Sequence, residues 1–208
     1  MIPVKNLDRA KSRLLGAADG GIGDRAAHEA LVLALVRDTV IAAASAPHVR
    51  RVLAVTSDPT VIAVLTADGI DTIPDIPDNG LNAAVTFGAA ELLRRDAMAT
   101  VAALQSDLPA LRPAELGAAL GEADGRRAFC ADRQGTGSTL LVAPQGRPLD
   151  PRFGAGSAVA HTTSGARAIT ASLPSLRCDV DTAEDLAVAC RLGLGAKTAT
   201  LIGNACCP

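Results

Sequence analysis

Aromatic residues are almost missing from this sequence, which excludes one common way of binding nucleic acids. Phe87, Phe129 and Phe153 are the only aromatic residues among 208, and neither Trp nor Tyr occurs. Proteins that bind single strands stack bases on aromatic side chains, and this chain offers few. A net charge of −2, with 20% charged residues, also leaves no basic excess to attract a phosphate backbone. We therefore expect no nucleic-acid partner.

Long apolar segments are missing as well. The longest uninterrupted apolar run, Ala30–Val36, is far shorter than the roughly 20 residues that cross a bilayer. Charged residues between Lys5 and Arg13 interrupt the N-terminal segment, so it does not resemble the apolar region of a secretory signal. These absences predict a cytoplasmic protein with no membrane partner.

Regular cysteine spacing is the third absence. The chain has five cysteines but no Cys-x-x-Cys pair. Zinc sites and disulfide frameworks both depend on such spacing and usually on an even number. We therefore expect reduced, structural thiols and no zinc site.

What is present predicts one α/β domain. A chain of 208 residues can bury a substantial core, and no repeat or linker divides it. Apolar strands that alternate with helices are typical of a mostly parallel sheet covered by helices on both faces. The residues from Lys197 to Pro208 show no clear pattern and are expected to be loosely ordered. The expected extended segments are Ile2–Val4, Arg51–Thr56, Ile70–Ile73, Ala99–Leu104, Arg127–Ala131, Thr139–Ala143, Ala168–Ala171 and Arg177–Asp179. The expected helices are Asp24–Ala46, Pro59–Ala67, Leu81–Arg95, Pro113–Ala123, Ser157–Ser164 and Ala183–Leu192.

The last third of the chain contains an Asp-x-Asp motif, Asp179-Val180-Asp181, where an extended segment is expected to lead into a helix. Residues two apart in an extended segment point to the same side, so the two carboxylates should project together. Paired carboxylates repel each other unless a cation lies between them, and their oxygens suit Mg²⁺ held jointly with phosphates. Thr182, with Asp185 three residues later, predicts the N-cap of the helix. The alternative is an exposed acidic turn that only caps this helix.

A further carboxylate, Asp107, follows the apolar strand Ala99–Leu104. Open α/β sheets bind their ligands at the carboxyl ends of the strands. A single Asp at such a place is common as a turn residue, but Asp107, Asp179 and Asp181 are all expected at the same rim. Together they are candidate ligands for one or two metal ions.

Basic residues gather in the loop expected after the first strand, where Lys5, Arg9, Lys11 and Arg13 occur close together. The whole chain has only three lysines against seventeen arginines, and two of those lysines fall within this loop. Lysine binds phosphate as a mobile point charge and arginine as a rigid fork. Lys5, Lys11 and Arg13 are therefore candidate ligands of a nucleoside triphosphate, although such a cluster can also be an ordinary solvated loop. No Walker-type glycine pattern occurs.

Four motifs, taken together, resemble those of one enzyme family. They are Pro-Val-Lys-x-Leu-x-x-Ala-Lys-Ser-Arg-Leu at residues 3–14, Asp-Asn-Gly-Leu-Asn at 78–82, Ser-Asp-Leu-Pro at 106–109 and Asp-Val-Asp-Thr at 179–182. Over essentially its whole length the chain resembles the guanylyltransferases of coenzyme F(420) biosynthesis. The first motif is specific to that family, whereas Asp-x-Asp is not. Members of the family join GMP from GTP to 2-phospho-L-lactate or, in mycobacterial-type members, to phosphoenolpyruvate.

The resemblance implies a single-domain, Rossmann-like nucleotidyltransferase fold, related to the enzyme that guanylates molybdopterin. It implies that Asp107, Asp179 and Asp181 bind the metal, expected to be Mg²⁺. It also implies a base-contacting turn that includes Gly80 and Asn82. The residues that it matches to the phosphoenolpyruvate site are Thr139, Gly154 and Ser157.

The residues themselves are compatible with these implied roles and also with ordinary ones. A glycine such as Gly154 lets the backbone approach an anion, and Ser157 would begin a helix whose N-terminal amides favour negative charge. An ordinary Gly-rich loop with a Ser cap would look the same, and Asp78-Asn79-Gly80 is a common turn sequence. The histidines have no motif partner, so we expect them on the surface or on helices, without a catalytic role. They are His28, His48 and His161.

The implied reaction explains why cations and carboxylates dominate the motifs. The acceptor is already a phosphate anion, so no base has to deprotonate it. The obstacle is repulsion between two anionic substrates, which cations must neutralise while the reacting atoms are aligned. Two-metal stabilisation fits the three carboxylates together with Lys11 and Arg13. We predict Lys11, Arg13 and Asp107 as the catalytic group.

Two other function classes stay open from the residues alone. A metal-dependent glycosyltransferase also uses Asp-x-Asp, although the basic loop argues against it. A non-catalytic nucleotide-binding module is the other class, and it requires that the carboxylates diverge in space. The partners implied by the resemblance are GTP and a three-carbon phosphorylated acid, with a possible hand-over of the labile product to the next transferase. Phosphoenolpyruvate is the expected acceptor, and 2-phospho-L-lactate, which differs only by reduction at one carbon, is the alternative.

Overall fold

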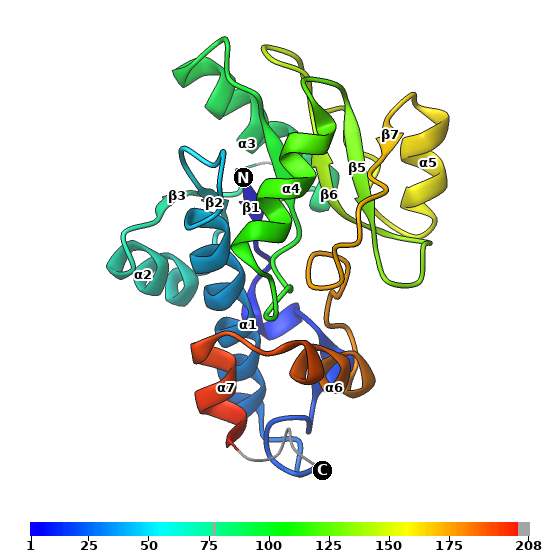
Figure 1. Cartoon of the computed structure of the whole chain (residues 1–208). Coiled ribbons are helices and arrows are strands. Elements are labelled where there is room, and N and C mark those ends of the chain that lie inside the picture. Colours follow the sequence, from blue (N-terminus) through cyan, green and yellow to red (C-terminus); the bar gives the residue numbers. More distant parts are fainter. Residues whose placement is uncertain (77, 204–208) are drawn as a thin grey trace.

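The strands form two hydrogen-bonded sheets that lie side by side (Figure 1). The computed structural model describes residues 1–76 and 78–203. In the first sheet the parallel order is β1 (Ile2–Pro3), β2 (Leu53–Val55) and β3 (Asp71–Ile73). In the second sheet the order is β4-β6-β5-β7, and these strands are β4 (Ala102–Leu104), β6 (Ser138–Val142), β5 (Ala128–Ala131) and β7 (Arg167–Ala168).

Met1 joins the two sheets. Its amino group donates to the carbonyl of Ala102 at 2.7 Å, and its carbonyl accepts from the amide of Leu104 at 3.1 Å. The start of β1 therefore lies beside β4, and the strands follow one another across the molecule in the order β3-β2-β1-β4-β6-β5-β7.

The direction of β6 departs from the parallel pattern. This strand is antiparallel to both β4 and β5, whereas the other three pairings among the described strands are parallel. Only a short turn separates β5 from β6, and a turn of that length cannot make the long crossover that parallel neighbours need. As a result β6 begins at the edge where β4 ends, with Leu104 paired to Leu140.

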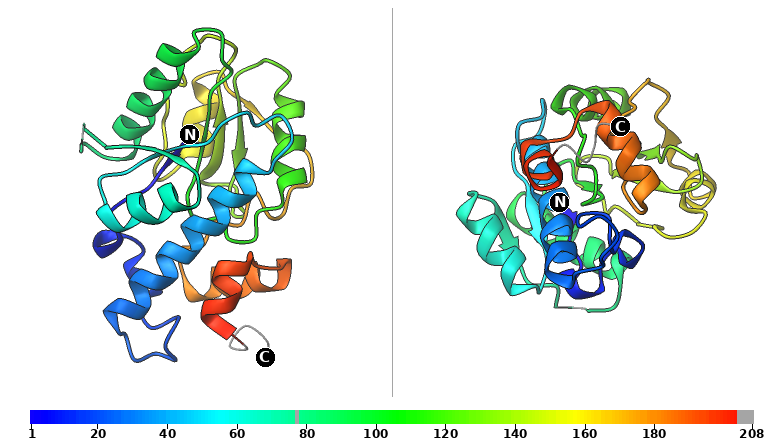
Figure 2. Two further views of the ribbon diagram at one scale, coloured as in Figure 1. Left: turned by 90° about the vertical axis from the view of Figure 1, so that its left-hand side faces the viewer. Right: turned by 90° about the horizontal axis from the view of Figure 1, so that it is seen from below.

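Helices cover both faces of the strands, as the sequence predicts. Figure 2 shows α3 and α4 on opposite sides of the sheet. Alternate strand residues divide between two apolar clusters: Ala54 packs with one face and its neighbours Leu53 and Val55 with the other. Three helices cover the first face: α1 (Arg25–Ala44), α2 (Pro59–Ala67) and α4 (Pro113–Ala123). The opposite face is covered by α3 (Leu81–Arg95) and α5 (Ser157–Thr163).

A third apolar cluster lies beyond the sheet, where α6 (Ala183–Leu192) and α7 (Ala196–Ile202) pack near one end of α1 (Figure 1). It includes Leu14, Leu35, Val180 and Leu186, all of them buried. This cluster connects the loop after β1 to the segment that contains the Asp-x-Asp motif, so it fixes both relative to α1.

Helix α7 corrects the expectation that the chain is loosely ordered from Lys197 onward. The Asp38 carboxylate of α1 accepts from the amides of Lys197 at 3.0 Å and Thr198 at 2.7 Å. These bonds satisfy donors that an N-terminal helix turn leaves unpaired. Because Asp38, which caps this helix, is distant in sequence, no local pattern predicts the helix. The final residues, 204–208, lie outside the described part of the chain.

Two smaller expectations are also wrong. The segment Arg177–Asp179 belongs to no described strand ladder, although the amide of Val180 does donate to the carbonyl of Asp107 at 3.0 Å. Cys130 and Cys178 are free and buried, as expected, but Cys190 is disulfide-bonded. Among the described residues, no helix has the length and apolar character that a bilayer span requires.

Candidate functional site

The loop after β1 is held in an unusual conformation around Lys11. Two 3₁₀ turns, η1 (Leu7–Arg9) and η2 (Ser12–Leu14), lie on either side of Lys11, whose φ of 54° is left-handed. Such a backbone is unfavourable for a residue other than glycine and persists only where its surroundings enforce it. Leu7 and Leu14 are buried, and the amide of Leu7 donates to the Asp58 carboxylate at 2.9 Å. The anchored loop therefore fixes the position from which the Lys11 side chain projects.

Lys11 joins two of the predicted carboxylates. Its Nζ contacts Oδ2 of Asp107 and lies 2.6 Å from Oδ1 of Asp181. Arg13 reaches the other oxygen of Asp181 at 3.3 Å, although its side chain is 70% exposed. Burial would by itself lower the pKa of the Lys11 ammonium, but the attraction of Asp107 and Asp181 outweighs it and raises the pKa. The lysine is therefore a permanent cation between two carboxylates.

The Asp-x-Asp motif is positioned by its own neighbours. Val180 is fully buried in the third apolar cluster, while Asp181 stays partly exposed, as alternation predicts. The predicted capping box at the start of α6 is confirmed: the Asp185 amide donates to Oγ1 of Thr182 at 3.2 Å, and the Thr182 amide donates to the Asp185 carboxylate at 3.1 Å. The motif thus caps a helix and also presents Asp181 to Lys11, so capping alone does not account for it.

The ionised form of Asp179 is destabilised by its surroundings. Burial, and then repulsion from the Asp107 carboxylate, raise the pKa of Asp179 to about 7, although Lys11 opposes the shift. Oδ1 of Asp107 is buried and has no hydrogen-bond partner among the described residues. The negative charge of the three carboxylates is therefore only partly balanced by Lys11.

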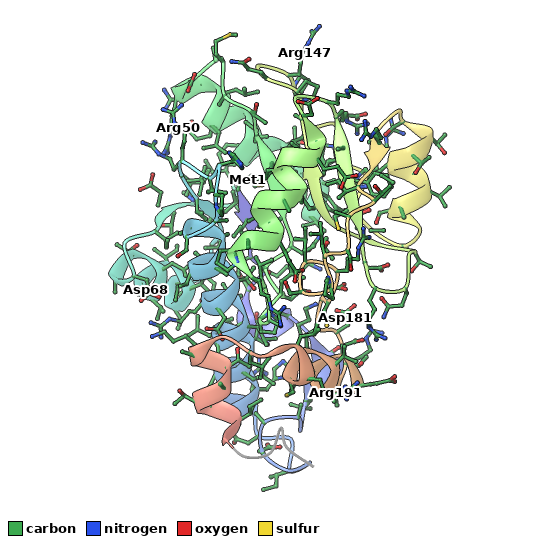
Figure 3. All side chains as sticks on the ribbon, viewed as in Figure 1. Met1, Arg50, Asp68, Arg147, Asp181 and Arg191 are labelled. Atoms are coloured by element: carbon green, nitrogen blue, oxygen red, sulfur yellow. The ribbon has the colours of Figure 1, made fainter. Side chains whose placement is uncertain are left out.

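The three carboxylates are not gathered into a ready metal cage. Among the described residues, no three aspartate, glutamate, histidine or cysteine side chains are close enough to hold one metal ion. The Lys11 ammonium instead lies between Asp107 and Asp181. The chemistry of the donors does fit a hard divalent cation, because all three are carboxylates and one oxygen of Asp107 has no hydrogen-bond partner in the described part of the chain. Figure 3 shows Asp181 between the strands and α6.

One cavity adjoins this cluster, and a second cavity adjoins the first. The first has a volume of about 230 Å³, and the residues that line it include Lys5, Lys11, Arg13, Asp107 and Asp181. The second has a volume of about 190 Å³, and Ser57, Asp75, Asp78 and Gly80 are among its lining residues. Both cavities are lined by Pro3, Val4, Lys5 and Leu81.

Gly80 and Asn82, which the sequence predicts near the nucleotide base, have different positions. Gly80 lines the second cavity and precedes α3 with a φ of 84°, a conformation that suits glycine. The Asn82 side chain instead bonds to the backbone of Phe153, donating to its carbonyl at 2.9 Å and accepting from its amide at 2.8 Å. Asn82 therefore joins the start of α3 to the loop that contains Gly154.

Thr139 lies in β6, whereas Gly154 and Ser157 lie around the start of α5, which the Ser157 hydroxyl joins to Ser138, the residue before Thr139. The amide of Ser157 donates to the carbonyl of Gly154 at 3.1 Å, and the amide of Gln105 donates to the carbonyl of Thr139 at 2.9 Å. The second bond places Thr139 beside Gln105, which precedes Ser106 and Asp107 in the chain. Gly154 is exposed, whereas the side chains of Thr139 and Ser157 are buried, and none of the three lines either cavity. Their role as acceptor ligands stays a prediction.

A buried polar network lies beneath this loop. Oγ of Ser157 donates to Oγ of Ser138 at 3.2 Å, and Ser138 lies 3.0 Å from Nδ1 of His161. The amide of Arg152 donates to Nε2 of His161 at 3.0 Å, which leaves Nδ1 as the protonated nitrogen. Burial, followed by the nearby Arg127 and Arg152, lowers the pKa of His161 to about 4. The imidazole is therefore neutral at physiological pH.

The sequence reasoning missed several of these residues. His161 lies on helix α5, one of the two kinds of position expected for it, but it is fully buried, and no local motif indicates that Ser138 and Arg152 contact its ring. Ser57 and Asp75 were not singled out either, although both line the second cavity. Ser57 follows β2 and Asp75 follows β3, so the rule that identified Asp107, a polar residue just after a strand, could have found them.

The chain is similar to known proteins over nearly its whole length. Residues 1–202 match the family model described as "Guanylyl transferase CofC like". The chain is 51% identical over 208 residues to the phosphoenolpyruvate guanylyltransferase of Salinispora arenicola, covering 99% of this chain and 93% of the relative. It is 50% identical to the protein of the same name from Geodermatophilus obscurus, covering 100% of this chain and 95% of that one.

A solved structure shares the fold. A putative nucleotide-diphospho-sugar transferase from Desulfovibrio desulfuricans superposes with a TM-score of 0.69, covering 98% of this chain and 93% of that protein. The two sequences are only 18% identical, so the likeness concerns the fold alone.

Proposed function

This chain belongs to the family of CofC-like guanylyl transferases, and from that membership we propose that it transfers GMP from GTP to phosphoenolpyruvate and releases pyrophosphate. The step would belong to coenzyme F(420) biosynthesis, with 2-phospho-L-lactate as the alternative acceptor. The names of the curated relatives support phosphoenolpyruvate. The observation that carries the proposal is the Lys11 cation held between Asp107 and Asp181 in a cavity that adjoins a second one.

The two cavities suggest how the nucleotide would lie. The triphosphate would occupy the first cavity, where Lys5, Lys11 and Arg13 supply positive charge, and the base would occupy the second, next to Gly80. The residues shared by both cavities give a continuous path between them. Asn82 would act on the nucleotide only indirectly, because both ends of its amide are bonded to Phe153.

We propose Mg²⁺ as the cofactor and Asp107, Asp179 and Asp181 as the residues that would hold it. The unpartnered Oδ1 of Asp107 and the raised pKa of Asp179 both support a site that is short of positive charge. When bound, Mg²⁺ would neutralise phosphate oxygens and stabilise the charge of the attacking and leaving groups. Lys11 would then be free to pair with phosphate oxygens instead of with both carboxylates.

The residues of the chain would contribute mainly position and charge. The acceptor phosphate is already nucleophilic, so no residue has to remove a proton from it. Lys11 and Arg13 would offset the repulsion between the acceptor and the triphosphate and align the acceptor oxygen with the α-phosphorus. A neutral His161 buried under the acceptor loop is consistent with a support role, since it carries no charge to the substrate.

The acceptor would approach from the side of Gly154. The Gly154 loop is held to α3 by Asn82 and to β6 by the serine network, so its exposed backbone has a defined position. Thr139 and Ser157 would act from beneath, because both side chains are buried. Hand-over of the labile product to the next transferase is part of the proposal and would involve a separate partner protein.

Pyrophosphate release tests the proposed function directly. The protein would be incubated with GTP, Mg²⁺ and either phosphoenolpyruvate or 2-phospho-L-lactate, and the next transferase would trap the product. We expect pyrophosphate and a guanylylated acid with phosphoenolpyruvate, and no reaction when Mg²⁺ is chelated. Equal use of ATP, CTP and GTP would contradict the guanylyl assignment.

The same assay separates the remaining classes. A glycosyltransferase would release a nucleoside diphosphate from a sugar nucleotide and no pyrophosphate from GTP. A nucleotide-binding module would bind GTP in calorimetry without any release. Faster turnover with 2-phospho-L-lactate than with phosphoenolpyruvate would replace the proposed acceptor by the alternative.

A further inference from the structure

The second cavity contains an acidic side chain that the reaction chemistry does not use. Asp75 follows β3, and its backbone is fixed by Ser57, whose hydroxyl accepts from the Asp75 amide at 3.1 Å and lies 3.3 Å from the Asp75 carbonyl oxygen. The carboxylate oxygen Oδ1 is buried and has no hydrogen-bond partner among the described residues. Buried polar atoms normally have a partner, so Oδ1 can accept a hydrogen bond that the described residues do not donate to it.

We propose that Asp75 selects guanine by accepting hydrogen bonds from N1–H and the 2-amino group of the base. This inference rests on the proposed function and deepens it, because it assigns the nucleotide specificity to one residue. The cavity of about 190 Å³ shares Lys5 and Leu81 with the phosphate-side cavity, so one nucleotide can reach both.

The donor and acceptor pattern of the bases makes a carboxylate selective. An ionised carboxylate only accepts hydrogen bonds. Guanine presents two adjacent donors on its Watson–Crick edge, N1–H and the 2-amino group, and so can satisfy both oxygens. Adenine presents the lone pair of N1 beside a single amino group, so one carboxylate oxygen would face another acceptor. A site built to hydrogen-bond one edge rejects an analogue that lacks it by large factors.

The electrostatics of the cavity support a role in accepting hydrogen bonds. Burial, together with the nearby Asp78, raises the pKa of Asp75 despite a backbone hydrogen bond that opposes the shift. Donors from a base would stabilise the ionised form. Asp78 lines the same cavity but is exposed, with a left-handed φ of 37°, so water can satisfy its oxygens and it is the less suitable base-reading group.

A change of base preference provides the sharpest test. Asp75→Asn keeps the shape but replaces one acceptor by a donor. That pair of groups matches xanthine, which offers N1–H beside a carbonyl oxygen, and mismatches guanine, which offers two donors. We expect the affinity for GTP to fall by about tenfold to a hundredfold. We also expect XTP to bind the variant more tightly than the wild type, so that the GTP-to-XTP preference shifts by at least about a hundredfold. Calorimetry with GTP and XTP measures both without requiring turnover.

Two further variants control the experiment. Asp71→Asn makes the same change at the other end of β3, where the side chain is half exposed and faces Arg51 and Arg95, and it should leave the preference unchanged. Asp78→Asn tests the other carboxylate of the cavity and should shift the preference less than threefold. Gain of XTP binding cannot result from misfolding, so the Asp75→Asn result does not depend on equal stability.

The outcomes separate this inference from the proposed function. An unchanged preference in Asp75→Asn, a switch that follows Asp78→Asn, or equal binding of ATP and GTP by the wild type would overturn the role of Asp75. Tight GTP binding without pyrophosphate release would contradict the proposed function, and the preference switch in Asp75→Asn would still support base reading.

Discussion

Two polar regions at the same edge of the sheet differ in charge. One is the charged cluster of Lys11, Asp107, Asp179 and Asp181, and the other is the neutral buried network of Ser138, Ser157 and His161. In the cluster, Lys11 lies between Asp107 and Asp181, and repulsion raises the pKa of Asp179. In the network, Ser157 and His161 are fully or almost fully buried, and His161 is neutral. The first region has charge that a ligand could rearrange, whereas the second has neutral hydrogen bonds that are already satisfied.

This difference separates residues that can act on a substrate from residues that hold others in place. A side chain that lines a cavity and has an unpartnered oxygen, such as Asp107, can accept a ligand without breaking the fold. A side chain whose polar atoms already bond inside the core, such as Ser157, would have to give up a bond to do so. The two regions should therefore respond differently to substitution.

The largest expected effect is on turnover in the charged cluster. Asp107→Asn removes one carboxylate but keeps its shape, and turnover should fall about a hundredfold or more, which is roughly 3 kcal/mol of transition-state stabilisation. The thermal midpoint should change little, because the substitution also relieves repulsion with Asp179. Pyrophosphate-release kinetics and a thermal melt measure the two quantities.

The matched control for Asp107→Asn is Asp124→Asn. Asp124 is exposed, with a left-handed φ of 46° that asparagine tolerates, and lines neither of the two cavities described above. It should keep wild-type turnover and stability. If Asp107→Asn instead melted early with its turnover intact, the cluster would be structural and the contrast between the regions would disappear.

The next effect concerns stability. Lys11→Met removes the cation from two carboxylates, one of which, Asp107, has only 11% of its side chain exposed. Breaking such a pair leaves a buried charge uncompensated, so we expect a loss of about 3 kcal/mol in the free energy of unfolding in metal-free buffer. Added Mg²⁺ should restore part of this loss, because it would replace the missing positive charge.

Urea denaturation with and without Mg²⁺ measures this effect, and Arg13→Met is the matched control. The Arg13 side chain is 70% exposed, and exposed pairs contribute little, so its stability should stay within about 0.5 kcal/mol of the wild type. Equal stability of Lys11→Met and the wild type in chelator would show that the carboxylates need no cation.

A third prediction uses the pH dependence of the neutral network. An unfolded histidine takes up its proton near pH 6.5, but burial lowers the pKa of His161 to about 4 in the folded protein. Between these values the unfolded chain binds more protons, so the stability contributed by neutral His161 is lost as pH falls from about 6.5 toward 4. The loss should reach at most about 3 kcal/mol.

His161→Gln should flatten that pH profile, although its stability at pH 7 will be lower because the bond to Ser138 or Arg152 is disturbed. His48→Asn is the control, since His48 is exposed and its left-handed φ of 68° suits asparagine. Its profile should follow the wild type. A His161→Gln profile as steep as that of the wild type would assign the acid sensitivity to other groups.

Local signals account for the parts of the fold that the sequence predicts well. Helices α3, α4 and α6 have the predicted bounds because their ends are marked within the chain. Pro113 occupies the first turn of α4, and Thr182 with Asp185 caps α6. Most strands were also expected in the right places, but the segment Arg177–Asp179 forms no described strand, and the described strands are shorter than the apolar runs.

The parts that the sequence could not predict depend on distant contacts. Lys11 lies 96 residues from Asp107 and 170 from Asp181 in sequence, so no local pattern shows that the lysine would lie between them. The same holds for Asn82, whose side chain bonds to the backbone of Phe153, 71 residues away in sequence. The motifs predicted carboxylates and basic residues at one edge of the sheet, and only the fold shows which of them pair with one another.

The smallest expected effect tests whether Ser157 touches the acceptor. Its hydroxyl bonds to Ser138 in the buried network, so Ser157→Ala should cost about 1 kcal/mol of stability and change the KM for phosphoenolpyruvate less than threefold.

Gly154→Ala should raise that KM about tenfold without altering GTP affinity, because the exposed loop would present a methyl group to the acceptor. Gly154 has a φ of 132° and Gly135 one of 75°, so Gly135→Ala, in the turn between β5 and β6, controls for backbone strain alone. Steady-state kinetics with each substrate varied in turn measures the three variants. A larger KM increase in Ser157→Ala than in Gly154→Ala would mean that the serine leaves the network to bind the acceptor, and that the neutral region is as active as the charged one.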